Sequence, residues 1–187
     1  MSNKIISIVG DLGELTPQNL SANLLARFST LIVAGQHALH KQADYSCVNN
    51  AEQLDKLMRE RAEKTTIIAP RDQYAKYVFY DKIECLPLFE DLSPYNFDPL
   101  ECSQQILALA TACWIGSPVV ALFDFMLEPK KETPALKAIL KIYPNTVFLF
   151  VRLKKGNKIT VFNDVTNLKQ MDETEFSAFY NQYIKKK

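Results

Sequence analysis

Short runs of mostly apolar residues recur along this chain, and segments with a helical pattern lie between them. The clearest runs are residues 4–9, 30–34, 65–69, 118–125 and 146–153. Strands that are apolar on both faces occur in parallel sheets, where helices cover both sides. The pattern therefore predicts an α/β fold, a three-layer sandwich with a mainly parallel sheet of the flavodoxin or Rossmann-like type.

Helix-start signals lie between these runs. A hydroxyl or acidic residue followed by proline is typical of an N-cap and first helical position, and it occurs at Thr16-Pro17, Asp98-Pro99 and Thr133-Pro134. The helix expected over residues 98–115 is apolar nearly all round, which predicts that it is buried. Residues 51–63 are expected as an amphipathic helix, and Asp172 and Glu175 are expected to cap a last helix.

Three segments have weaker patterns. Residues 72–80 are expected as a short helix, and residues 83–89 as an edge strand, because Pro87 removes a backbone donor. A Lys-Lys-Gly-Asn turn at residues 154–157 follows the strongest strand. Residues 158–165 are therefore expected to fold back as a C-terminal antiparallel hairpin strand at the edge of the sheet.

Length and charge limit the class of protein. A chain of 187 residues favours one domain, spanning residues 1–187, with a core that needs no disulfide or metal. Lys plus Arg total 22 and Asp plus Glu total 21, so the basic excess of a nucleic-acid-binding protein is missing. No apolar run approaches the roughly 18–20 residues that cross a bilayer, so no membrane association is expected. The first apolar run is too short for a secretory signal.

The four cysteines, Cys47, Cys85, Cys102 and Cys113, lack the paired spacing of a zinc or redox motif. Cys102 and Cys113 would share one face of the expected helix, where packing explains them. Free buried thiols suit a reducing compartment, so the cytoplasm is the expected location.

Ligands of open α/β sheets bind beyond the carboxyl ends of the strands, near the point where the strand order reverses. The candidates for ligand binding at these ends are Asp11, Glu14, Gln36, Arg71, Asp72 and Asp124. The candidates for catalysis are Asp11, Glu14, His37 and Asp124, because carboxylates and imidazole serve as general bases, nucleophiles or metal ligands. The alternative is that these polar residues only end strands and cap helices, as is normal in this fold.

The loop after the first strand argues against common cofactors. Residues 10–14 contain two glycines, two acids and no lysine, which matches neither the dinucleotide fingerprint nor the triphosphate loop. Its carboxylates repel phosphate but can accept ribose hydroxyls or hold magnesium through water. No flavin, NAD or zinc motif is present, and His37 and His40 have no evident third ligand. Magnesium is compatible with these residues, but no dedicated metal site is expected.

The stretch from Val119 to Pro129, with the helix that ends at Pro144 and the strand that follows, resembles the middle of response-regulator receiver domains. The resemblance implies that Asp124 matches the phosphorylated aspartate of that family. It also aligns residues 65–69 with the family's first strand, after which only Asp72 is acidic. Val151 stands where the family has Thr or Ser, and the family's Lys-Pro after its last strand is missing.

Three functions fit these observations. The first is a non-catalytic or regulatory α/β module that recognises a protein partner or a small ligand. The second is an enzyme that acts on a nucleoside or nucleotide-type substrate through the acidic strand ends. The third is a degenerate receiver-like domain that works by dimerisation. Homo-oligomers are compatible with all three, and the sequence leaves open whether the protein is an enzyme.

Overall fold

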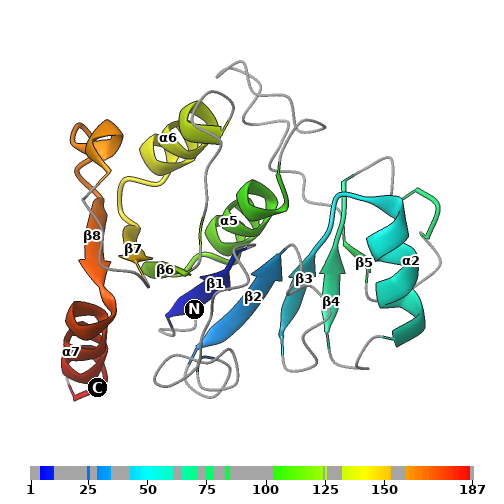
Figure 1. Ribbon diagram of the computed structural model, residues 1–187, viewed down its shortest axis with the longest axis horizontal. Coiled ribbons are helices and arrows are strands. Elements are labelled where there is room, and N and C mark those ends of the chain that lie inside the picture. The colour runs from blue at the N-terminus through cyan, green and yellow to red at the C-terminus, as the bar shows by residue number, and fades with distance from the viewer. Residues whose placement is uncertain are drawn as a thin grey trace.

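A computed structural model describes residues 5–10, 25, 29–34, 43–60, 65–70, 75–77, 83–84, 103–123, 125, 132–152 and 159–185. These residues form one eight-stranded sheet with the order β5-β4-β3-β2-β1-β6-β7-β8 (Figure 1). All seven strand pairings are parallel. The strands are β1 (Ile6–Val9), β2 (Thr30–Ala34), β3 (Tyr45–Cys47), β4 (Thr66–Ile68), β5 (Ile83–Glu84), β6 (Val119–Phe123), β7 (Val147–Arg152) and β8 (Leu168–Asp172).

Helices cover both faces of the sheet. On one face, α5 (Gln104–Ile115) and α6 (Glu132–Ile142) pack against strand residues such as Ile8 and Phe148. On the other face, α7 (Glu173–Lys185) packs against Val151, and α2 (Ala51–Glu60) packs against Ile67. Figure 1 shows α5 and α6 above the sheet and α7 below it. The predicted three-layer α/β sandwich of Rossmann or flavodoxin-like type is confirmed.

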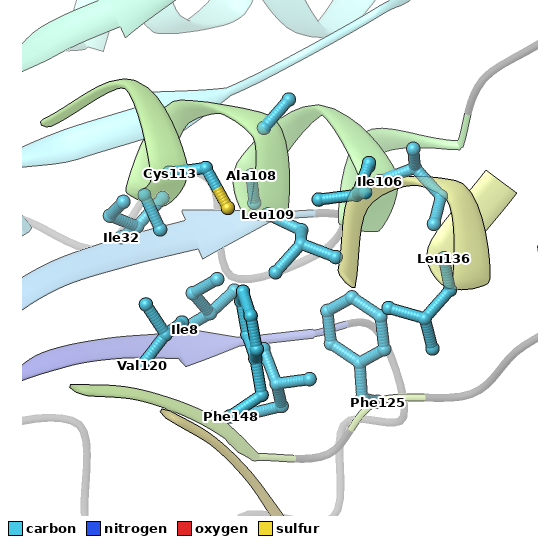
Figure 2. Close-up of a cluster of buried hydrophobic side chains, with 14 of the residues drawn as sticks. Ile8, Ile32, Ile106, Ala108, Leu109, Cys113, Val120, Phe125, Leu136 and Phe148 are labelled. Atoms are coloured by element: carbon cyan, nitrogen blue, oxygen red, sulfur yellow. The ribbon is translucent and has the colours of Figure 1, made fainter. Parts of the chain in front are cut away.

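The largest core cluster lies under α5. Leu109 and Cys113 of that helix point toward Ile8 and Ile32 of the sheet, beside the Phe148 ring (Figure 2). Burying one such aliphatic or aromatic side chain contributes about 1.5–3 kcal/mol, so this layer supplies much of the folding free energy. Every residue from Gln105 to Cys113 is buried, which confirms the expected burial of this helix.

The start of α5 differs from the prediction. Ser103 has an extended backbone (φ −67°, ψ 157°), and its Oγ accepts a hydrogen bond from Ile106 N at 3.3 Å. The helix therefore begins at Gln104, and a single helix running from Asp98 is wrong. A hydroxyl directly before the apolar segment provides a closer N-cap. The predicted end is confirmed, since Gly116 adopts φ 81° and its N–H bonds back to the last turn.

The predicted C-terminal hairpin is wrong. After β7 the chain forms a short 3₁₀ helix (Thr160–Phe162) and returns to begin β8, which pairs with β7 in parallel. Phe162 and Val165 are buried in the α5–α6 layer instead of lying in a strand. The Asn167 Nδ2 group donates to the carbonyls of Leu140 and Tyr143 at 2.9 and 3.0 Å. These hydrogen bonds hold the segment before β8 against the C-terminal end of α6.

Most other expected elements agree with the structure to within a few residues. Strand β2 has the predicted bounds, α2 ends at Glu60, and β5 is an edge strand. Strand β3 was not expected. The helix expected after Thr16-Pro17 lies outside the described residues except for Leu25, which is helical and buried, and residues 75–77 form a turn.

The cap of α7 is confirmed. Asp172 N donates to Glu175 Oε2, and Glu175 N donates to Asp172 Oδ1, both at 2.8 Å. We expect Asp172→Ala to lower the free energy of unfolding by about 1 kcal/mol, because it leaves a first-turn N–H without its acceptor. Urea denaturation measures this change, with Thr174→Ala in the same turn as the control. Equal stability of the two variants would contradict the role of the cap.

Two thiols are buried in the core. Burial raises the pKa of Cys47 to about 12, against a smaller opposing effect of the hydrogen bond with Thr111. Burial also raises the pKa of Cys113 far above its usual value. Both groups therefore stay protonated at neutral pH, and neither has the thiolate character of a nucleophile.

We expect the Cys85→Ser/Cys102→Ser variant to react with a thiol reagent at pH 8 only after it is unfolded. The pKa values of both thiols are higher in the folded protein than in the unfolded chain, where a thiol has a pKa of about 8.5. Their contribution to the free energy of unfolding is therefore complete below that pH and falls as the pH rises above it, because the unfolded chain then loses the thiol protons more readily. Urea titrations at pH 7.5 and 9.5 should therefore give a lower free energy of unfolding at the higher pH. Rapid labelling of the native variant would refute the burial of these thiols.

Candidate functional site

The strand order reverses between β1 and β6. Val9 pairs with Phe123 at the carboxyl ends of these strands, and Gly10 N donates to Phe123 O at 2.9 Å. The chain goes on from β1 to β2 on one side and from β6 to β7 on the other. We call the carboxyl ends of β1 and β6 the switch point. In open α/β sheets this is the place where ligands bind.

The predicted site residues follow the described strand ends. Asp11, Glu14, Gln36, His37, Arg71, Asp72 and Asp124 all lie outside the described residues. The structure establishes the order of the strands that precede these residues. Their roles in a site remain predictions.

The strand order relates the predicted residues to the switch point in different ways. Asp11 follows β1 and Asp124 follows β6, which are neighbours, and β2 before His37 is the other neighbour of β1. Strand β4, which precedes Asp72, stands three strands from β1, or about 14 Å at the usual strand spacing. The order therefore favours Asp11 with Asp124 over a cluster that includes Asp72.

The same order weighs against the receiver-like alignment. Receiver domains have the flavodoxin-like order 2-1-3-4-5, in which the first strand lies beside the strand that precedes the phosphorylated aspartate. The alignment makes β4 that first strand, yet β3, β2 and β1 separate β4 from β6. The likeness is thus limited to the local pattern of a strand, a helix and a strand.

A carboxylate that was not singled out from the sequence lies in the first turn of α6. Glu132 is only 8% exposed, and the helix it begins is the one that follows β6. Because a helix that follows a parallel strand begins at the carboxyl edge of the sheet, Glu132 belongs to the same edge as the switch point. The Thr133-Pro134 pair predicted Thr133 as the N-cap, but α6 already begins at Glu132, and acids are common in a first helical turn.

Two glutamines connect the helices on opposite faces of the sheet. Gln104 Nε2, at the start of α5, donates a hydrogen bond to Gln53 Oε1, in the first turn of α2. The backbone N–H of Gln53 is itself bound by Asn50 Oδ1 at 3.0 Å. We call Gln53 and Gln104 the amide bridge. Both helices begin at the carboxyl edge, so the bridge lies at that edge, on the β3 side of the switch point.

The amide bridge contains an unsatisfied atom. Gln104 Oε1 is buried, and it has no hydrogen-bond partner within the described part of the chain. Sequence patterns could not have indicated this pair, because the two residues are 51 positions apart.

A hollow of about 470 Å³ lies away from the switch point, beside β8 at the edge of the sheet. Its lining is half apolar and half polar: Phe162, Asn163, Val165, Leu168, Lys169, Gln170, Met171 and Glu175. The Gln170 amide is already engaged, because it donates to Ile159 O at 2.8 Å and accepts from Ile159 N at 2.7 Å. Strands β6 and β7 separate this hollow from β1.

Among the described residues, no three His, Cys, Asp or Glu side chains are grouped as a metal site requires. None of the described helices is long and apolar enough to span a membrane. Comparisons with protein-family models, with curated proteins and with solved structures find no match for this chain. The functional argument therefore rests on its own residues and topology.

Proposed function

We propose that this protein is a small-ligand-binding α/β domain whose ligand sits beyond the carboxyl ends of β1 and β6. The observation that carries the proposal is the reversal of strand order between these two strands. The connections that leave them go to opposite sides, and in open α/β sheets this divergence provides room for a ligand.

The residues around the switch point support this proposal. In the sequence, Asp11 directly follows Gly10 and Asp124 directly follows Phe123, the two residues joined by the hydrogen bond at the switch point. The carboxylates of Asp11 and Asp124 supply hydrogen-bond acceptors, which can orient a bound molecule or hold magnesium through water.

Binding is preferred to catalysis and to a protein partner for specific reasons. Binding requires only the strand ends and their acceptors, whereas catalysis needs a positioned nucleophile or base, and the described thiols are buried and protonated. A protein partner would suit the hollow beside β8, but the Gln170 amide there is occupied by the chain itself. We further propose a reducing compartment such as the cytoplasm, because Cys47 and Cys113 are free thiols.

A thermal-shift screen with nucleosides, nucleotides, sugars and divalent metal ions tests the proposal, because a molecule that binds only the folded state raises the melting temperature. We expect at least one class to raise it. Asp11→Asn and Asp124→Asn should weaken the binding of that compound about tenfold or more, because each removes a charged acceptor.

Asp164→Asn provides the matched control. Asp164 is an exposed carboxylate in the segment that leads into the start of β8, and it pairs with Lys137 at 2.7 Å. This variant should bind like the wild type. The proposal fails when no compound raises the melting temperature, or when Asp124→Asn and Asp11→Asn bind as tightly as Asp164→Asn.

A further inference from the structure

We propose that two charged residues, Lys169 of β8 and Glu175 of α7, keep the outer edge of β8 from pairing with the same strand of a second copy of this chain. We call these two residues the edge guard. The surface that they protect is separate from the switch point, because β6 and β7 lie between β1 and β8.

Strand β8 is the longer of the two edges of the sheet. A strand at an edge presents backbone N–H and C=O groups that act as a template for another chain, unless the strand is very short or carries a charge. The other edge strand, β5, has only two residues, whereas β8 has five. The hollow beside β8 is lined by Leu168 and Met171, which belong to core clusters on opposite faces of the sheet. A further strand therefore has room to approach this edge.

The pairing with β7 shows which backbone groups of β8 face outward. Phe148 N of β7 donates to Asn167 O at 2.8 Å, so the carbonyl that directly precedes β8 faces β7. Backbone groups alternate in direction along a strand. The N–H and C=O groups of Leu168, Gln170 and Asp172 therefore face away from β7, toward an incoming strand.

Glu175 blocks two of the three registers in which β8 could pair with itself through at least two outward residues. A two-fold axis perpendicular to the sheet makes two copies of one strand antiparallel. With Gln170 opposite itself, Leu168 pairs with Asp172 of the second copy. With Met171 opposite itself, Gln170 pairs with Asp172. Both registers need Asp172 N, which already donates to Glu175 Oε2 at 2.8 Å.

Lys169 blocks the third register. In that register Leu168 pairs with Gln170 of the second copy, and neither residue needs Asp172. Lys169 then stands directly opposite itself, and like charges at opposed positions of an antiparallel pair are destabilising. The side chain is exposed, at the centre of the outward edge. An exposed lysine on an edge strand is a common protection against edge-to-edge pairing.

Sedimentation velocity of Lys169→Thr/Glu175→Ala tests the proposal. The two changes remove the opposed charges and release Asp172 N, so we expect the average mass to rise up to about twofold over the wild type at equal concentration. Addition of Gln170→Pro should return the mass to the wild-type value, because all three registers use Gln170. Proline is tolerated there, since the Gln170 N–H faces away from β7.

The matched control is Lys56→Thr/Glu52→Ala, which removes the same two charges at exposed positions of α2 and should keep the wild-type mass. Lys169→Thr alone leaves the α7 cap in place, so its fold does not depend on the loss of that cap. This variant should also rise in mass, because it opens the third register.

An unchanged mass for both Lys169 variants overturns the proposal. A rise that persists with Gln170→Pro also overturns it, because the association then uses another surface. An equal rise in the α2 control assigns the effect to the loss of charge in general, with the same consequence. The measurement contains no ligand, so ligand binding at the switch point stands or falls separately.

Discussion

Strands β1 and β6 hydrogen bond to each other well inside the sheet, and every side chain along both strands is buried. A strand buried on both faces needs a layer of helices on each side, and parallel neighbours need connections that cross from one end of the sheet to the other. The helical layers on both faces of the sheet follow from the first requirement. The crossover connections between the strands follow from the second.

The two helical layers meet this requirement in different ways. Helix α5 is buried along nearly its whole length and packs across β1, β2 and β3, so it covers the middle of the sheet. On the opposite face α7 inserts Phe176 edge-on against Phe123 of β6, with ring centroids 4.9 Å apart. Such aromatic pairs add to the free energy of burial, so the C-terminal helix is tied directly to the central strands.

The same central pairing determines where chemistry is favoured. Because β1 and β6 are parallel neighbours, their carboxyl ends lie at the same edge of the sheet, and the connections that leave them go to opposite sides. The amide bridge between α2 and α5 lies at that edge and connects the two helical layers.

The sequence by itself determined the fold class, because short apolar runs such as Val119–Phe123 alternate along the chain with helical patterns, which is typical of parallel strands covered by helices on both faces. It also determined local caps such as Asp172 with Glu175, which depend on residues three positions apart. Only the tertiary structure decided the rest. Strand β8 is largely polar, so its pairing with β7 depends on the packing of Phe162 and on the hydrogen bonds of Asn167. The neighbourhood of β1 and β6 and the bridge from Gln53 to Gln104 join residues far apart in the chain, and such contacts leave no local pattern for the sequence to reveal.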